Sequence, residues 1–557
     1  NSQQLPRLPV PKLDDTLRKF LKSVQPFLND EESVKTSGLI KQFNSNMGVG
    51  PKLQELLVQH ATKHQNWLEE WWINTAYLEY RDPVVVFSSP GLVYPIQKFR
   101  NESDQLEYAA KTLLAALEYK SMIDKYIPVE MMGKNPLDMC QYKKIFGTCR
   151  IPHEKRDKLS YNDSKYVTVI HNNHVNLWGS DGKKLSQQQI IEALKTIKKF
   201  MYVLAFNQIL SRLAGYLNRE SLLDIERSLA VLCLDRAVGV HDARSDWQRR
   251  TLAAAQTIHG GGAASNGANR WFDKTIQFIV GEDGVTGLTY EHSPAEGQPI
   301  AVMTDFIINR IMKVDEAKQV CKECIVDVSF YRVDKKVFLY RLVDDLELNC
   351  FKYDKYGKNF IKSHKFSPDS YLQMAMLHQT PGAHYESAAT RMFAGGRTET
   401  IRSCSPESIE FAKAMLDTKA DPKLKMQTMS KAISAHKDYT ALQGLGVDRH
   451  LLGLKLIAKE NGIEVPELYS DAGYVRSAHM RISTSQVACK SDGFMCYAPL
   501  VADGYATCYN PRDLDINFAT AAFRRHPDTG CEPYRRALEQ SLQDMHDLLL
   551  LNTKSKL

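Results

Sequence analysis

Segments with strand-like and helix-like patterns alternate along the whole chain, and this mixture is the strongest constraint on its fold. No internal repeat and no low-complexity tract interrupts the pattern. The chain has 557 residues, whereas a usual domain has about 100–200. We therefore expect two large domains with an α/β or α+β architecture.

Periodicity and turn residues predict individual elements. Helices are expected at residues 106–126, 408–416, 428–461 and 533–551. Strands are expected at residues 166–170, 175–178, 277–280 and 287–291. Asp283-Gly284 predicts the turn of a hairpin between the last two strands, which places His292 just beyond a strand end. Leu5 to Pro11 predicts an extended arm, because its prolines remove backbone donors and fix φ.

Composition and charge exclude several classes of protein. Hydrophobic residues make up 43% and charged residues 25%, as in ordinary soluble globular proteins. The net charge of +7 is spread along the chain without a dense Lys/Arg run. This distribution argues against a nucleic-acid partner and weakly favours a polyanionic ligand. No apolar stretch reaches the ~18–20 residues that span a bilayer, so no transmembrane segment is expected.

Cysteine usage and the chain ends bear on the compartment. The eleven cysteines are scattered and odd in number, which favours a reducing environment. Cys321 and Cys324 form one CxxC without a second pair at zinc-ribbon spacing, so no metal site is expected. The C-terminal tripeptide Ser555-Lys556-Leu557 predicts a peroxisomal location. Because the sequence starts at Asn1, removal of a mitochondrial targeting segment stays open.

Several separated segments resemble the carnitine/choline acyltransferase family. LPRLPVPKLDDTL at the N-terminus resembles its proline-rich signature, residues 270–297 resemble its active-site signature, and Ser483-Thr484-Ser485 resembles its Ser-Thr-Ser motif. The resemblance runs from about Leu5 to the C-terminus. It implies two similar α/β domains of the chloramphenicol-acetyltransferase type, with mixed sheets covered by helices and an active-site tunnel between them. By the resemblance, residues 80–330 and 331–557 form the domains, and residues 1–79 pack with the second.

His292 is the candidate catalytic base. Transfer of an acyl group from a thioester to an alcohol needs a group that takes the hydroxyl proton, and a neutral imidazole suits this step near neutral pH. Glu296 follows four residues later and is expected to orient the ring or to stabilise the imidazolium. The resemblance gives Ser485 the role of donor to the oxyanion, a role typically worth about 2.7–4 kcal/mol of barrier.

The resemblance also assigns the two substrates, acyl-coenzyme A and carnitine. Lys358 and Lys362 are expected to bind coenzyme A phosphates beside Lys365, and Asp369 matches a position near the pantetheine arm. Arg449 stands where choline enzymes carry Asn, and a guanidinium suits the carnitine carboxylate. The alternative for Arg449 is a purely structural role, a helix-surface ion pair with Asp448. Further carnitine contacts are expected at Tyr385, Thr398, Ser483 and Tyr497.

The expected acyl group is short. Met495 matches the bulky residue that fills the acyl pocket of the acetyl-specific members, where medium- and long-chain enzymes have Gly. Generic packing of a flexible Met is the alternative. No permanently bound cofactor is expected, and a monomer is expected.

Three segments look shorter than the family pattern, at residues 194–217, 313–353 and 376–384. They leave open a catalytically impaired member that acts as a binding protein. A medium-chain carnitine enzyme or a choline enzyme is the alternative within the class.

Overall fold

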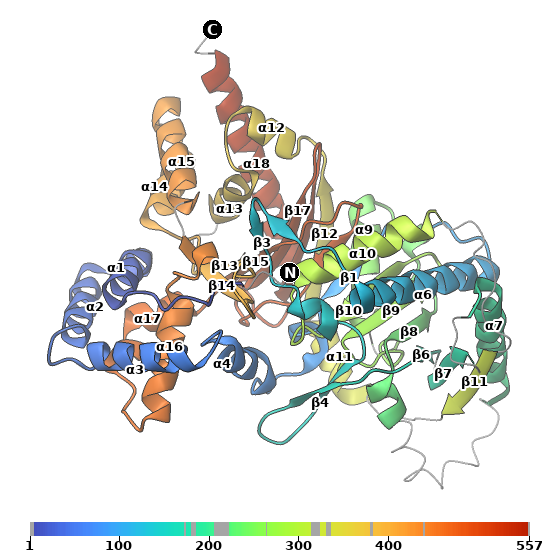
Figure 1. The fold of residues 1–557 in the computed structure, drawn as a ribbon. Coiled ribbons are helices and arrows are strands. Elements are labelled where there is room, and N and C mark those ends of the chain that lie inside the picture. The colour runs from blue at the N-terminus through green and yellow to red at the C-terminus, as the bar shows by residue number, and fades with distance from the viewer. Residues whose placement is uncertain are drawn as a thin grey trace.

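The computed structural model consists of two mixed sheets covered by helices, with a helical region at one side (Figure 1). It describes residues 5–171, 174–179, 185–204, 222–262, 264–313, 324–329, 336–378, 382–437 and 440–554. The predicted α/β class, with mixed sheets and helical layers, is confirmed. None of the helices in these ranges is long and apolar enough to cross a membrane.

The larger sheet is built mainly from the N-terminal half of the chain. Among the described residues its strand order is β11 (Cys324–Ser329), β7 (His174–Gly179), β6 (Val167–Ile170), β8 (Val231–Asp235), β9 (Ile276–Gly281), β10 (Thr286–Tyr290), β1 (Gly91–Val93) and β16 (Phe494–Cys496). The edge strand β16 comes from far along the chain and pairs antiparallel with β1, so that Met495 lies opposite Leu92. The predicted strands at 166–170, 175–178, 277–280 and 287–291 are confirmed within one or two residues.

The hairpin β9–β10 determines where His292 lies. Gly284 has φ +83°, a left-handed conformation in which a Cβ would come 2.1 Å from the carbonyl oxygen of Gln97. A residue with a side chain would therefore clash at this turn. The return strand β10 ends at Tyr290, and His292 follows two residues later.

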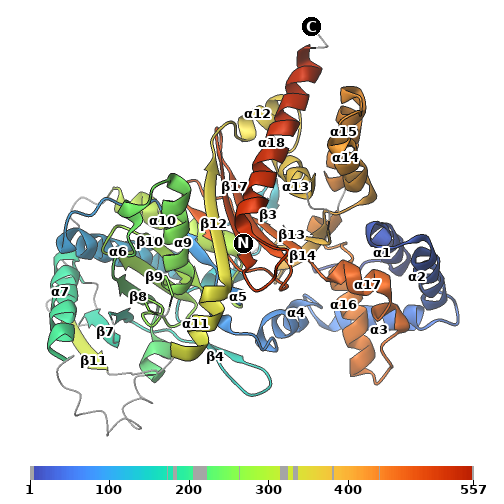
Figure 2. The same cartoon turned by 180° about the vertical axis from the view of Figure 1, so that it is seen from behind.

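The smaller sheet belongs to the C-terminal half. Its order is β12 (Leu346–Tyr353), β18 (Ile516–Phe523), β17 (Tyr505–Pro511), β15 (Ile482–Gln486), β13 (His384–Ala389) and β14 (Thr398–Arg402). Strand β15 runs parallel to both β13 and β17, which puts Ser483 beside Tyr385. Helices α13 (Pro368–His378) and α18 (Cys531–Lys554) pack together on this half (Figure 2).

Helices pack around the larger sheet. We call this part of the molecule the larger half, and the part built on the smaller sheet the smaller half. Helix α6 (Glu102–Lys125) packs against α7 (Gln187–Leu204) and against α10 (Gly297–Ile311), which begins directly after Glu296. Helix α9 (Asp246–His259) contacts β1 of the larger sheet and β12 of the smaller one, so it joins the two halves. The predicted helices at 106–126 and 533–551 are confirmed by α6 and α18.

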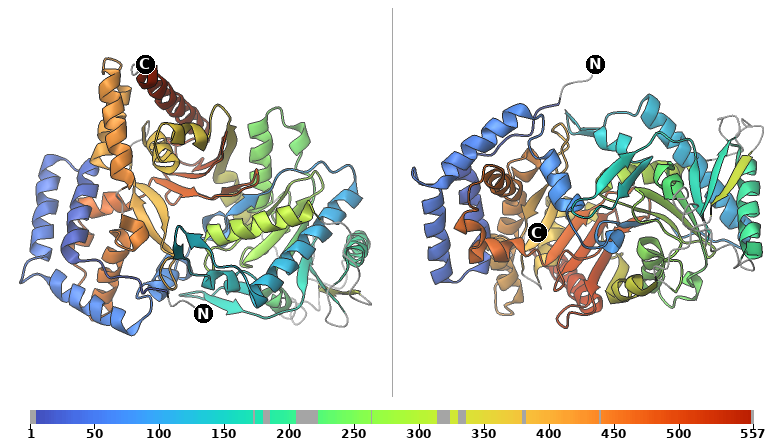
Figure 3. Two further views of the ribbon diagram at one scale, coloured as in Figure 1. Left: turned by 45° about the horizontal axis from the view of Figure 1, so that its top comes forward. Right: turned by 90° about the horizontal axis from the view of Figure 1, so that it is seen from below.

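An N-terminal group of helices packs against C-terminal ones. Helices α1 (Leu13–Val24), α2 (Asp30–Phe43) and α3 (Val49–Lys63) share an apolar core with α16 (Asp448–Glu460), and α17 (Ala472–Ala478) packs on α1 and α2 (Figure 3). Residues 5–12, in front of α1, form no helix or strand, as expected for the proline-rich arm. The domain boundaries near residues 80 and 330 stay predictions.

The prediction of one helix at residues 428–461 is wrong. The structure has α15 (Pro422–Lys437), a 3-10 turn at Thr440–Gln443 and the separate helix α16. Gly444 has φ +68°, and a Cβ there would come 2.8 Å from Leu8. The first helix ends at Lys437 and the second begins at Asp448, so that Arg449 stands in the first turn of a new helix instead of mid-helix. The predicted helix at 408–416 is confirmed by α14 (Pro406–Leu416).

Some expectations fall outside the described residues. They are the C-terminal Ser555-Lys556-Leu557, Cys321 of the CxxC, and parts of the three segments that look shortened. The turn that Asn172-Asn173 predicts between the strands at 166–170 and 175–178 also lies there.

Candidate active site

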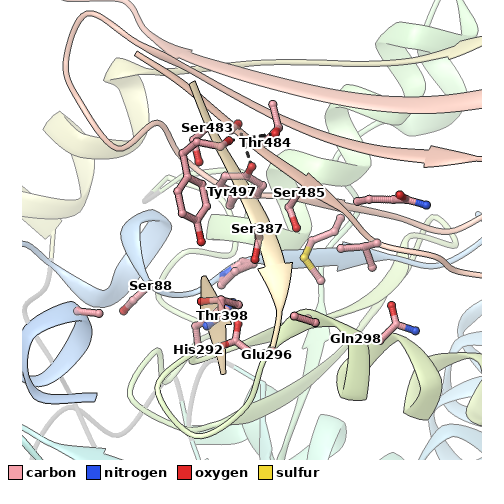
Figure 4. Close-up of a pocket in the computed structure, with 18 of the residues that line it drawn as sticks. Ser88, His292, Glu296, Gln298, Ser387, Thr398, Ser483, Thr484, Ser485 and Tyr497 are labelled. Atoms are coloured by element: carbon pink, nitrogen blue, oxygen red, sulfur yellow. Dashed lines mark hydrogen bonds and ion pairs between the residues drawn. The ribbon is translucent and has the colours of Figure 1, made fainter. Parts of the chain in front are cut away.

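A cavity of about 600 Å³ is lined by residues from both halves of the molecule. The larger half contributes Tyr290, His292 and Glu296, and the smaller half contributes Tyr385, Thr398 and residues 483–487. Figure 4 shows the imidazole of His292 beside Glu296 and Thr398, with Ser485 across the cavity. The structure therefore brings together residues that are more than four hundred positions apart in the sequence, from Trp72 to Leu500.

His292 is held between two tyrosine rings. Its ring lies 5.5 Å from the ring of Tyr77 and 5.4 Å from the ring of Tyr290, measured between centroids. Its Nδ1 is 2.9 Å from the hydroxyl of Tyr77, and its backbone N–H donates to the carbonyl of Ser88. The side chain keeps 22% of its surface exposed, on the cavity side. These contacts fix the ring while leaving it accessible to a substrate.

Charge and burial keep His292 ready to accept a proton. Burial lowers the pKa of its imidazole, the Glu296 carboxylate opposes that shift, and the Arg397 guanidinium adds to it. The ring is therefore neutral at neutral pH, as a general base must be. Burial tends to raise the pKa of Glu296, but Arg397 and His292 hold it below its usual range. An ionised Glu296, 3.5 Å from Nε2, is placed to stabilise the imidazolium.

A buried ion-pair network lies behind the strand end. The Glu291 carboxylate accepts from the hydroxyl of Ser293 at 2.7 Å and pairs with the Arg150 guanidinium at 3.3 Å. Arg150 also pairs with Asp157 at 2.8 Å. These groups fix the turn that carries His292. Sequence reasoning missed Arg150, because it is 141 residues from Glu291 and belongs to no recognisable local pattern.

Strand β15 places the two serines of the Ser-Thr-Ser motif on one face. Side chains alternate along a strand, so Ser483 and Ser485 face the same way and Thr484 faces the other. The hydroxyl of Thr484 donates to the carbonyl of Tyr385 and accepts from Gln373. Tyr497, which also lines the cavity, donates its hydroxyl to the carbonyl of Ser483 at 2.9 Å.

Arg449 lies directly behind the cavity wall. Its guanidinium stacks on Trp72 at 3.6 Å and donates to the carbonyl of Thr398 at 3.0 Å and to the hydroxyl of Thr400 at 3.3 Å. Both Trp72 and Thr398 line the cavity. The residue is 7% exposed. The alternative of a surface ion pair with Asp448 is wrong, because Asp448 instead pairs with Arg402 (both 2.9 Å contacts).

Glu399 lies beside this guanidinium. Its carboxylate accepts from the backbone N–H groups of Thr400 and Arg449. Glu399, which lies on strand β14, thereby caps the start of helix α16. Burial raises the pKa of Glu399 to about 7, against the pull of the Arg449 charge. A carboxyl that ionises with difficulty leaves the positive charge of Arg449 incompletely neutralised. The first turn of α16 therefore presents a cation toward the Thr398 side of the cavity.

Met495 narrows one end of the cavity. Its sulfur lies 3.7 Å from the hydroxyl of Tyr290, and a Cβ added at Gly297 would come 3.2 Å from its terminal methyl group. Met495 is 3% exposed. The space between Tyr290, Gly297 and Met495 is therefore already filled.

The predicted coenzyme A residues do not line this cavity. Lys358 and Lys362 lie one turn apart on α12 (Lys358–Ser363), and Lys358 pairs with Asp513 at 3.1 Å. Asp369, in the first turn of α13, accepts from the hydroxyl of Tyr509 and lies in a buried group with Glu386 and His436. Burial, followed by the charge of Glu386, raises the pKa of Asp369 to about 7. The role of these residues stays a prediction.

Two aromatic residues of the site were not predicted. Tyr77 and Trp72 come from α4 (Glu69–Ile73) and the π-helical turn Asn74–Leu78 that follows it. The run WWINTAYLEY, dense in aromatic side chains, is the signal that could have drawn attention to them.

The fold and the site define an acyltransferase: a neutral imidazole backed by a carboxylate stands in a cavity between two α/β halves, with hydroxyl donors across from it. The family model described as Choline/Carnitine o-acyltransferase matches residues 8–540. The chain belongs to this family.

Curated relatives match along nearly the full length. A carnitine O-acetyltransferase from Columba livia is 40% identical over 100% of this chain and 95% of its own length. The human carnitine O-acetyltransferase is 38% identical, over 99% of this chain and 95% of its own length. A choline O-acetyltransferase from Danio rerio is 34% identical, over 98% of this chain and 93% of its own length.

Proposed function

We propose that the protein transfers a short acyl group, such as acetyl, reversibly between coenzyme A and the hydroxyl of carnitine. The single observation that carries the choice of acceptor is Arg449, a buried guanidinium behind Thr398 and Trp72 in the cavity wall. A carboxylate on the acceptor gives this cation a partner, and choline has no such group. The carnitine relatives also match at higher identity than the choline relatives.

The residues of the cavity account for each step of the reaction. The imidazole of His292 takes the proton of the acceptor hydroxyl while the oxygen attacks the thioester carbonyl. Negative charge develops on the former carbonyl oxygen, where the hydroxyl of Ser485 donates. The intermediate collapses, the C–S bond breaks, and the imidazolium returns its proton to the leaving thiolate. Glu296 stabilises the imidazolium between the two proton transfers.

Binding of the substrates rests on separate groups. Tyr385, Thr398, Ser483 and Tyr497 line the cavity and supply hydroxyls and aromatic faces for carnitine. Aromatic faces attract a trimethylammonium group. Lys358 and Lys362 on α12, with Asp369, are the proposed contacts for coenzyme A outside the cavity.

The proposal is tested with a panel of substrates on the purified protein. Acetyl-, butyryl- and octanoyl-coenzyme A are each combined with carnitine and with choline, and release of free thiol is followed. We expect acetyl transfer to carnitine to have the highest kcat/KM. Faster transfer to choline would reassign the acceptor, and coenzyme A binding without turnover would indicate an impaired member of the family.

Replacing Met495 with Gly is expected to admit longer acyl chains. Removing this side chain empties the space against Tyr290 and Gly297, into which an octanoyl tail can extend without overpacking. We expect kcat/KM for octanoyl-coenzyme A to rise by at least about tenfold, since each buried methylene is worth about 0.8 kcal/mol. Met480→Gly, at a 9% exposed Met that does not line the cavity, is the control. Unchanged octanoyl transfer in Met495→Gly would refute this assignment of the acyl pocket.

A further inference from the structure

Arg397 is a buried guanidinium directly behind the candidate base. It precedes β14 in the chain and is 7% exposed, and it does not line the cavity. Its Nε donates to the carboxylate of Glu296, one terminal nitrogen donates to the carbonyl of Ser293, and the other donates to the carbonyl of His292 at 3.0 Å. The guanidinium also lies 5.3 Å from the centroid of the Tyr77 ring.

This pattern uses all three nitrogens of the planar guanidinium as donors. The three acceptors belong to one short stretch, 292–296, that connects the end of β10 to the start of α10. A lysine carries an equal charge, but its donors lie on one nitrogen, so it cannot reproduce the spacing of the three guanidinium nitrogens that reach two carbonyls and a carboxylate. A buried charge that meets an opposite charge and two carbonyl dipoles is stabilised where it lies.

We propose that Arg397 is a positioning residue, whose three-way contact with the 292–296 segment holds the His292 imidazole and the Glu296 carboxylate in their reactive arrangement. The inference rests on the proposed function, since it names the group that supports the same base. Arg397 acts through these residues and has no contact of its own with the cavity. A displacement of about 1 Å at a reacting group can lower a rate by about 10²-fold.

The charges around His292 come from several elements. Tyr77 faces it from the turn after α4, and Tyr290 faces it from β10. Glu296 lies at the start of α10, and Arg397 approaches from the segment before β14. The carboxylate of Glu291, the residue before His292 in the chain, is paired with Arg150. Arg397 donates directly to His292, Ser293 and Glu296, and its charge lowers the pKa of His292.

The test separates the geometry of Arg397 from its charge. Arg397→Lys keeps a positive charge and loses the fork, so we expect kcat for acetyl transfer to fall about 100-fold while KM for both substrates changes much less. Arg397→Gln removes the charge as well, so the pKa of His292 should also rise. Wild-type kcat in Arg397→Lys, or a loss confined to KM, would overturn the proposal.

A second readout does not depend on turnover. Diethyl pyrocarbonate modifies neutral imidazole, so the rate of labelling of the peptide that contains His292, measured by mass spectrometry against pH, reports the pKa of that ring. We expect the midpoint to move to higher pH in Arg397→Gln and to move less in Arg397→Lys. If the midpoint does not move in Arg397→Gln, the inference is wrong, even where the wild-type protein proves to use a different acceptor.

Matched variants guard against a general loss of structure. Arg270 is another buried guanidinium that pairs with a carboxylate, Asp235, and donates to two backbone carbonyls, but it does not line the cavity or contact residues 292–296. Arg270→Lys should lower Tm without lowering kcat of the folded protein. If Arg397→Gln does not fold, Glu296→Gln/Arg397→Gln leaves neither charge unpaired. Its labelling midpoint should then lie above that of Glu296→Gln alone, and an equal midpoint would overturn the proposal.

Discussion

Replacing His292 with Ala is expected to lower kcat for acyl transfer by about 10²–10⁴-fold, the usual contribution of a general base. The reason is specific to this site: the neutral ring between Tyr77 and Tyr290 is the basic group that the cavity presents near the serines of β15. The rate of thiol release from acetyl-coenzyme A in the presence of carnitine measures the effect. KM for either substrate should change little, because the ring holds neither one in the ground state.

The control is a second buried histidine. His259, at the end of α9, is 5% exposed and does not line the cavity. His259→Ala should lower Tm and leave kcat of the folded protein near the wild-type value. If His292→Ala kept wild-type kcat, the general-base mechanism would have to be abandoned, whatever the effect at His259.

Replacing Arg449 with Asn should raise KM for carnitine by about 10–100-fold, because a hydrogen bond to a charged group is worth about 1.5–3 kcal/mol. The guanidinium is held rigidly by Trp72, Thr398 and Thr400, so little of its binding energy is spent on ordering it. KM for acetyl-coenzyme A should stay within about twofold. Initial rates against carnitine concentration provide the measurement.

Choline supplies an internal control for Arg449. It has the hydroxyl and the trimethylammonium group but no carboxylate, so KM for choline should not rise in Arg449→Asn. An equal rise for carnitine and choline would mean that the substitution disturbs the cavity as a whole. An unchanged KM for carnitine would remove Arg449 from the binding site.

The sequence predicted those parts of the fold that depend on neighbouring residues. The hairpin turn at Gly284 and helix α18 both follow from local periodicity or backbone conformation. The prediction of one helix at 428–461 is wrong because the helical spacing continues on both sides of the break, whereas the chain between Lys437 and Asp448 includes the left-handed Gly444, which lies close to Leu8. No local pattern specifies that long-range contact.

Tertiary structure alone decided how the site is assembled. Arg397 and Glu296 are 101 residues apart, and Arg150 and Glu291 are 141 residues apart. No local pattern specifies such pairs, since the burial that makes a charge seek its partner exists only after the sheets and helices have packed. The same holds for the stacking of Arg449 on Trp72. It also holds for the position of Lys358, Lys362 and Asp369, which lie outside the lining of the cavity. The chemistry of single residues was thus readable in the sequence, and their mutual placement came from long-range packing.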